Sequence, residues 1–165
     1  MSAYRVRLAT ESDAGSVCRL HRAAWEEVFS ASNLYPSQTE AESRWSDLIR
    51  NKMVIVVLCE FENKLVGFIA SLVSNTSFQI TDLYVYPEYR RHGIGRALMN
   101  EALKQAKHRP ATLWVAETSG PAISLYQKTG FLSTGETKSE PRRIDGARLV
   151  KMYRDCSSTE STVSR

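Results

Sequence analysis

The chain has 165 residues and a formal net charge of +4, with 42% hydrophobic and 24% charged residues. This length and composition fit one domain with a substantial core, and no apolar run approaches the 18 residues of a membrane span. The basic residues are scattered, without the dense basic run or reading motif of a nucleic-acid binder, so neither a nucleic-acid nor a membrane partner is expected.

The cysteines and histidines indicate neither a metal site nor a disulfide framework. The three cysteines are far apart and form no Cys-x-x-Cys pair: Cys18, Cys59 and Cys156. With only three histidines, a metal site would need a spaced carboxylate cluster, which the sequence lacks, so we expect no metal. The N-terminus has no apolar stretch of the kind found in secretory signals, which favours a cytoplasmic location.

The first half of the chain predicts two helices followed by antiparallel strands. Alternating apolar and polar residues predict a strand at 4–8. Apolar residues at helical spacing predict a helix at about 13–29 and a shorter one around 41–49, separated by a loop at 30–37. Strands follow at 53–59, 65–73 and 78–85. Because the connections between these strands are short, we expect an antiparallel meander.

The second half of the chain alternates helices and strands. The pattern predicts a helix from about 94 to 108, a strand at 111–115 and a short helix at 121–128 that Gly130 closes. A strand should begin at Phe131, and the last should lie at 147–154. The strands on either side of the 94–108 helix should be parallel, because a helix joins them.

No internal repeat or linker divides the chain. We therefore expect one domain over residues 3–154. Residues 155–165 are polar and rich in serine and threonine, without an apolar period. They should form a disordered tail.

A glycine loop between a strand and a helix carries the strongest chemical signal. The loop reads Arg90-Arg91-His92-Gly93-Ile94-Gly95-Arg96. The start of a helix leaves about four backbone N–H groups unpaired and carries roughly half a positive charge. Glycines let a ligand approach the backbone, and the arginines add positive charge. The loop therefore suits a phosphate or pyrophosphate group.

Other interpretations of this loop compete. A P-loop needs a Gly-Lys pair, which the chain lacks. A dinucleotide fingerprint needs a small residue where Leu98 stands, and only one parallel crossover is expected. An isolated Gly-x-Gly is also common as a simple helix start, so the residues of the loop alone leave that alternative open.

Two motifs together resemble the GNAT N-acetyltransferase superfamily. Arg90-x-x-Gly93-x-Gly95 is similar to its Arg/Gln-x-x-Gly-x-Gly/Ala signature. The stretch from Ala122 to Phe131 is similar to the later part of its Asn-x-x-Ala-x-x-Leu-Tyr-x-Lys-x-Gly-Phe block. The resemblance extends over about 4–154. It implies an α/β (α+β) fold with a mixed sheet of about seven strands, flanked by about four helices. An antiparallel meander is followed by a parallel pair that forms a V-shaped opening.

The resemblance implies acetyl-CoA as the acyl donor and a primary amine as the acceptor. The pyrophosphate would lie on the loop at 90–96. A bulge in the 78–85 strand would present amides to the pantetheine and the acetyl carbonyl, at Leu83, Tyr84 and Val85. The family's asparagine is replaced by Ser119, which is shorter and puts one pantetheine contact in doubt. Tyr126 matches the tyrosine that protonates the leaving thiolate; the alternative is a core aromatic.

A general base should remove a proton from the amine. The first candidate is Asp82, which we expect just before the bulge, where many relatives carry an acid; a solvated carboxylate is the alternative. The other candidates are Glu26, Glu27 and Glu117. By resemblance, the first helix and its loop form a wall of the acceptor pocket. The candidate residues there are Trp25, Glu26, Phe29 and Tyr35, although Trp25 also suits the core.

The loop at 138–148 should form another wall. Its arginines at 142, 143 and 148 suggest an acceptor with an acidic group. The acceptor itself, a small molecule or a peptide amine, is not named by the sequence. By analogy with the family, in which dimers are common, a homodimer is possible. The alternative function is a non-catalytic acyl-CoA binding or sensing module.

Overall fold

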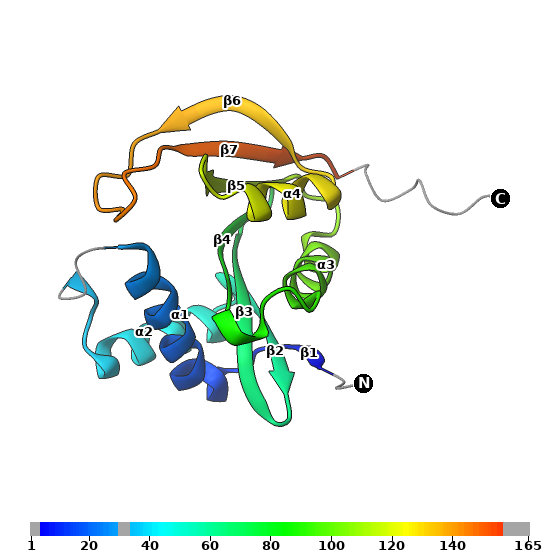
Figure 1. Cartoon of the computed structure of the whole chain (residues 1–165). Helices are drawn as coiled ribbons and strands as arrows, with labels where there is room; N and C mark the ends of the chain where they lie inside the picture. The colour runs from blue at the N-terminus through cyan, green and yellow to red at the C-terminus, as the bar shows by residue number, and fades with distance from the viewer. Residues whose placement is uncertain (1–3, 30–33, 157–165) are drawn as a thin grey trace.

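A computed structural model describes residues 4–29 and 34–156, and its seven strands form one mixed sheet in the order β1-β2-β3-β4-β5-β7-β6 (Figure 1). The strands are β1 (Arg5–Leu8), β2 (Val54–Phe61), β3 (Lys64–Val73), β4 (Phe78–Val85), β5 (Ala111–Ala116), β6 (Leu132–Lys138) and β7 (Leu149–Arg154). The helices are α1 (Ala14–Val28), α2 (Gln38–Arg50), α3 (Ile94–Ala106) and α4 (Gly120–Lys128), with short 3-10 helices η1 (Glu11–Asp13) and η3 (Pro87–Tyr89).

The predicted fold class and strand topology are confirmed. Strands β1 to β4 form an antiparallel meander, β4 and β5 are parallel, and α3 lies between them in the chain. Most of the predicted tail, residues 157–165, lies outside the described residues, as does residue 3 at the expected start of the domain. Residues 30–33 of the predicted loop also lie outside the described part.

Two helix ends differ from the prediction for local reasons. Helix α2 begins at Gln38 because Ser37 and Glu40 form a capping box, in which the Glu40 carboxylate accepts from the Ser37 amide at 3.1 Å. Helix α3 ends at Ala106 rather than 108, because Lys107 has a φ of 56° and leaves the helical conformation.

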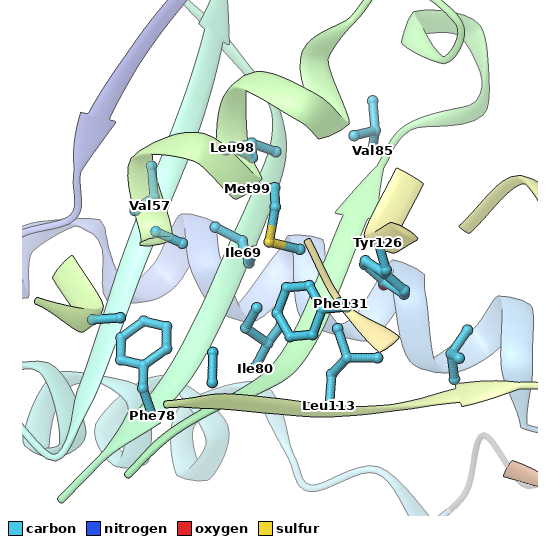
Figure 2. Packing of buried hydrophobic residues seen from close by; sticks show 14 of the residues in the cluster. Val57, Ile69, Phe78, Ile80, Val85, Leu98, Met99, Leu113, Tyr126 and Phe131 are labelled. Carbon is cyan, nitrogen blue, oxygen red and sulfur yellow. The ribbon is translucent and has the colours of Figure 1, made fainter. Parts of the chain in front are cut away.

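The helices cover both faces of the sheet and create two cores. Helices α1 and α2 lie on one side of β2–β4, and α3 lies on the other (Figure 1). The core under α3 and α4 contains two phenylalanines that are fully buried, Phe78 and Phe131, together with Leu98 and Met99 (Figure 2). Fully burying each side chain of this size contributes about 1.5–3 kcal/mol, so this layer fixes α3 and α4 against the sheet.

Strands β4 and β5 separate soon after they meet. Their parallel ladder pairs Phe78–Ile80 with Ala111–Leu113. Beyond Ile80, the edge of β4 that faces β5 has no ladder partner among the described residues. A strand edge without a partner presents backbone N–H and C=O groups that a ligand can pair with. This is the V-shaped opening that the family resemblance implied.

A β-bulge interrupts β4 at the opening. Asp82 pairs with Ala70 and Ile80 pairs with Ser71, so Thr81 is an extra residue in β4. The expectation that Asp82 precedes the bulge is therefore wrong, because Asp82 follows the extra residue.

The bulge changes which side chains face each layer. Ile80 and Leu83 belong with the core under α3, whereas Tyr84 packs against the core under α1. Side chains alternate along a strand, so Asp82 lies on the same side as Tyr84. If the same residues alternated regularly along β4, Asp82 would instead share the side of Ile80. The bulge therefore turns the Asp82 carboxylate toward α1.

An ion-pair network fixes the start of α1. Arg7 on β1 donates to the Asp13 carboxylate at 2.8 and 2.9 Å and to Glu60 on β2 at 2.8 Å. The hydrogen bonds from Arg7 lower the pKa of Asp13 to about 2. The Asp13 side chain is 14% exposed, so solvent screens this interaction only in part. The network ties the N-terminal end of α1 to the sheet.

Replacing Asp13 with Asn should lower the free energy of unfolding by about 2 kcal/mol at pH 7, because the Arg7 guanidinium loses its carboxylate. The folded-state pKa lies below the unfolded value of about 4, so this stabilisation is present above pH 4 and is lost as the pH falls toward 2. Urea unfolding of both proteins from pH 7 to pH 2.5 measures the effect. A difference that does not shrink below pH 4 would contradict it. Asp47→Asn, at an exposed ion pair on α2, is the control and should change little.

Candidate active site

A cavity of about 730 Å³ opens where β4 and β5 separate. Its walls come from α1, β4, β5, the start of α3, α4 and the segment around β6 and β7. Most of the residues predicted for the site line it: Trp25, Phe29, Asp82, Leu83, Tyr84, Val85, Arg90, Arg91, Gly93, Ile94, Gly95, Ser119 and Tyr126. The fold thus brings together side chains from three stretches that are far apart in the sequence, at 25–29, 82–95 and 119–126.

Five candidates do not line this cavity: Glu26, Tyr35, His92, Arg96 and Glu117. Glu26 lies on the exposed face of α1. Glu117 follows β5 and accepts a hydrogen bond from the Arg148 amide at 3.2 Å, so its carboxylate is committed to the β5–β7 connection. Neither carboxylate is placed to receive a proton inside the cavity, which leaves Asp82 and Glu27 from the original set of bases.

The start of α3 forms one end of the cavity. Gly93 is the N-cap and has a φ of 80°, a conformation that glycine adopts without strain. The first helical hydrogen bond runs from the Ala97 amide to the Gly93 carbonyl at 3.0 Å. In the described part of the chain, the amides of Ile94, Gly95 and Arg96 therefore have no backbone acceptor. A Cβ at Gly93 would meet only the Tyr4 hydroxyl, at 3.8 Å, so the approach to these amides is open.

The motif position of Arg90 implied a contact with the pyrophosphate, but in the structure its guanidinium binds groups of the protein itself. Its guanidinium donates to the Glu27 carboxylate at 2.7 Å and to the Val85 carbonyl at 2.8 Å. This hydrogen bond lowers the pKa of Glu27, which remains ionised and is a poor proton acceptor. Arg90 therefore links the end of β4 to α1, while Arg91, with an exposed side chain and a φ of 67°, lines the cavity.

Tyr126 on α4 enters the cavity from the buried side. The residue is 8% exposed, and its ring packs edge-on against Phe131 with centroids 6.1 Å apart. Burial, assisted by the negative charge of Asp82, raises the pKa of Tyr126 to about 12. The phenol therefore stays protonated over the whole physiological range and can donate a hydrogen bond. The dependence on Asp82 also means that the two side chains interact electrostatically.

His21 on α1 is a cavity residue that was not among the predicted site residues. Its Nε2 atom lies 3.5 Å from Asp82 Oδ1, and its Nδ1 atom lies 2.7 Å from the Tyr35 hydroxyl. The signal in the sequence was a histidine on the apolar face of an amphipathic helix. Its spacing fits the helical period, which is typical of a core position.

Aromatic and basic side chains line the other end of the cavity. Trp25 and Phe29 on α1 pack with ring centroids 4.4 Å apart. The segment after β6 docks on them through the Ile144 amide, which donates to the Val28 carbonyl at 3.0 Å. Arg143, which lines the cavity, forms two 2.9 Å hydrogen bonds with Asp145.

The basic wall expected from the 138–148 loop is largely neutralised within the loop. Arg142 pairs with Glu140 at 2.8 Å, just as Arg143 pairs with Asp145. Lys138 lines the cavity with its ammonium 4.3 Å from the centre of the Trp114 ring. The predicted positive charge is present, but internal carboxylates balance two of its arginines.

Across the described residues, no group of three or more His, Cys, Asp or Glu could hold a metal ion. The helices in the same residues are also too short or too polar to cross a bilayer.

The model of the acetyltransferase (GNAT) family matches residues 16–131. An uncharacterised N-acetyltransferase from Methanocaldococcus jannaschii is 29% identical over 140 residues, or 78% of this chain. The chain spans only 60% of the length of that relative. A Bacillus subtilis protein named as a ribosomal-protein alanine N-acetyltransferase is 27% identical over 64% of this chain and 72% of its own.

Solved structures agree in fold at low sequence identity. An acetyltransferase from Salmonella typhimurium, solved with acetyl-CoA, has a TM-score of 0.77 and 14% identity over 99% of this chain and all of its own. Spermidine N-acetyltransferase from Vibrio cholerae, solved with CoA and spermine, has a TM-score of 0.71 and 22% identity, and covers 91% of this chain and 94% of its own. From the family match and the shared topology, the chain belongs to the acetyltransferase (GNAT) family.

Proposed function

We propose that this protein is an N-acetyltransferase that moves the acetyl group of acetyl-CoA to a primary amine. The observation that carries the proposal is the cavity itself, which places an anion-binding helix start, a buried protonated tyrosine and an aspartate around one opening in the sheet. Each corresponds to one requirement of the reaction: holding the donor, protonating the leaving thiolate and attracting the amine.

The start of α3 fits the diphosphate of a CoA thioester. The free amides of Ile94, Gly95 and Arg96 and the dipole of α3 favour an anion, and Arg91 adds charge at the same end. The two oxygens of a diphosphate that face the protein can accept from several of these amides at once. Ser119, at the first turn of α4, lines the cavity at the position where the family has asparagine and would contact the pantetheine.

The free edge of β4 suits the acyl end of the donor. When bound, acetyl-CoA supplies an activated thioester carbonyl. In the vicinity of Leu83, Tyr84 and Val85, backbone donors on this edge would stabilise the negative oxygen that develops as the amine attacks. One such preorganised donor is worth about 3–4 kcal/mol of transition-state stabilisation.

Tyr126 would assist the departure of the thiolate. Its pKa of about 12 lies above the value of about 8.5 for an ordinary thiol. Complete transfer of the Tyr126 proton to a thiolate is therefore unfavourable in free energy. Tyr126 is therefore a hydrogen-bond donor to the sulfur while negative charge develops there, and it gives up its proton only as the carbon–sulfur bond breaks.

Asp82 would act on the acceptor. Its carboxylate lies at the opening, on the α1 side of β4, where it attracts a protonated amine. The amine could enter along Trp25 and Phe29, whose rings form an apolar wall. The names of two relatives described above give alanine of a ribosomal protein and spermidine as the molecules acetylated, and both carry amino groups. A non-catalytic acyl-CoA binding module is the alternative, and a homodimer remains an expectation from the family.

Arg91→Ala should weaken acetyl-CoA binding about 3- to 30-fold and flatten its dependence on salt, because one cation beside the diphosphate is removed. Isothermal calorimetry at two salt concentrations measures both effects. Lys107→Ala, at an exposed lysine after α3, is the control and should bind normally. Absence of heat with wild-type protein and any CoA thioester would end the proposed function.

Tyr126→Phe should leave acetyl-CoA affinity within about twofold and reduce kcat roughly 10- to 100-fold, because the ring still packs but the donor to the sulfur is gone. Release of free thiol during turnover reports kcat, and calorimetry reports affinity. Tyr153→Phe on β7, where the side chain is exposed, serves as the matched control. Unchanged turnover in Tyr126→Phe would exclude the acid role.

An amine screen reporting thiol release should find a primary amine acceptor, with peptides that begin with alanine and spermidine as the first probes. Because Arg142 and Arg143 are paired within their loop, acidic and neutral forms of one acceptor should differ in kcat/KM by less than about threefold. A strong preference for the acidic form would mean that these arginines bind the substrate. Binding of acetyl-CoA without turnover of any amine would favour the sensing module.

A further inference from the structure

Three side chains from different elements form a chain that ends in the cavity. Tyr35 lies in the segment before α2, His21 on α1 and Asp82 on β4. The Tyr35 hydroxyl is 2.7 Å from His21 Nδ1, and His21 Nε2 is 3.5 Å from Asp82 Oδ1. The Tyr35 hydroxyl also donates to the Cys18 carbonyl, at 3.4 Å. His21 and Asp82 line the cavity, whereas Tyr35 stands behind His21.

The 2.7 Å contact fits either tautomer of His21, and the second contact of the hydroxyl, with the Cys18 carbonyl, favours the tautomer with the proton on Nδ1. A hydroxyl has one proton to donate, and the Cys18 carbonyl can only accept. If Tyr35 donates to Cys18, the short contact with His21 requires Nδ1 to be the donor. Burial raises the pKa of Tyr35, so the hydroxyl keeps its proton. In the neutral imidazole, Nε2 is then an acceptor, and it faces the cavity next to Asp82.

We propose that His21 is the general base of the reaction, with Tyr35 fixing its tautomer and Asp82 stabilising the imidazolium that forms. The inference rests on the proposed acetyl transfer. An ammonium that contacts both Nε2 and Oδ1 would donate to both atoms, since His21 and Asp82 both line the cavity. The 3.5 Å separation of these atoms is too long for a good direct bond.

The proton count of the reaction fits this assignment. An ammonium has three N–H bonds and the amide product has one, so two protons leave the nitrogen. One goes to His21 Nε2 before the attack, and the nitrogen lone pair so released forms the bond to the acyl carbon. The second leaves the nitrogen as the carbon–sulfur bond breaks. The thiolate takes the proton of Tyr126, and the second proton, passed on through solvent, restores the Tyr126 hydroxyl. His21 returns its proton to solvent.

An imidazole is better matched to this task than a carboxylate. A peptide amino group titrates near pH 8, an imidazole near 6.5 and a carboxyl group near 4. Proton transfer to a typical carboxylate would therefore be unfavourable by about 10⁴-fold, whereas transfer to a typical imidazole is unfavourable by only about 30-fold. Asp82 lies beside the nitrogen that accepts the proton, so its negative charge stabilises the imidazolium that forms.

The surroundings of His21 suit an imidazole that changes charge. Asp82 faces it from β4 and Tyr35 from the segment before α2; the remaining ring neighbours are apolar, and are Trp25 on α1, Trp45 on α2 and Phe68 on β3. Two cations lie over rings that neighbour His21: the Arg22 guanidinium, 4.8 Å from the centre of the Tyr35 ring, and the Arg142 guanidinium, 5.6 Å from the centre of the Trp25 ring. The other cavity charges close to α1, Glu27 and Arg90, neutralise each other.

The first test compares His21→Gln with wild type using the best amine from the screen. At pH 7, kcat/KM should fall roughly 100-fold. Acetyl-CoA affinity should stay unchanged. The loss should shrink as the pH rises above the pKa of the amine, because free amine no longer needs a base. Tyr35→Phe should show a smaller loss with the same pH dependence, and His108→Gln, an exposed histidine after α3, should show none. A loss in His21→Gln that is equal at every pH, or no loss, would overturn the proposal.

The second test does not require turnover and separates this inference from the acetyltransferase assignment. Nitrogen-15 NMR of the wild-type imidazoles reports which nitrogen of His21 is protonated in the neutral form. We expect the Nδ1–H tautomer, with a shift toward a mixture in Tyr35→Phe. A dominant Nε2–H tautomer would overturn the proposal even if acetyl transfer occurs, because Nε2 could not accept a proton. If the expected tautomer is found in a protein that acetylates no amine, the proposed function fails while the geometry of the base stands.

Discussion

The separation of β4 from β5 is the constraint on which the rest of the site depends. Two parallel strands that stayed paired would satisfy each other's backbone and leave no room between them. Here the ladder stops at Ile80 and Leu113, so a free strand edge faces a cavity in the middle of the sheet. The fully buried layer under α3 and α4 holds the opening apart, since Phe131 and Leu98 fix the helices that flank it.

The bulge at Thr81 decides which chemistry faces this opening. By shifting the alternation of β4, it turns Asp82 toward α1 and leaves Leu83 in the core under α3. Helix α1 then matters as the carrier of His21, and its position is fixed at one end by Arg7 and near the other by the bond between Arg90 and Glu27. A backbone irregularity of one residue thus connects the sheet to the side chains that would handle protons.

The fold could be predicted from the sequence, and so could the place of the glycine loop at the start of α3, because both depend on local signals. Hydrophobic periodicity located the helices and strands, and the glycine motif located the start of α3. Features that depend on packing between distant segments were not predictable. The motif could not reveal that the Arg90 guanidinium points to Glu27, or that Thr81 rather than a later residue is the bulge. His21 was not among the predicted site residues because its helical position is typical of a core residue, and its partners Tyr35 and Asp82 belong to other segments of the chain.

The distribution of charge gives the cavity a direction. Two of its arginines are balanced by nearby carboxylates, Arg90 by Glu27 and Arg143 by Asp145. The positive groups that remain are the start of α3 with Arg91 and, over the Trp114 ring, Lys138; the negative point near α1 is Asp82. A donor with an anionic end and an acceptor with a cationic end would therefore enter from opposite sides. Their reactive groups would meet beside Tyr126, where burial keeps the phenol protonated. In the proposed acetyl transfer, the internal ion pairs would thus help by neutralising charges that weaken this separation of a positive end from a negative end.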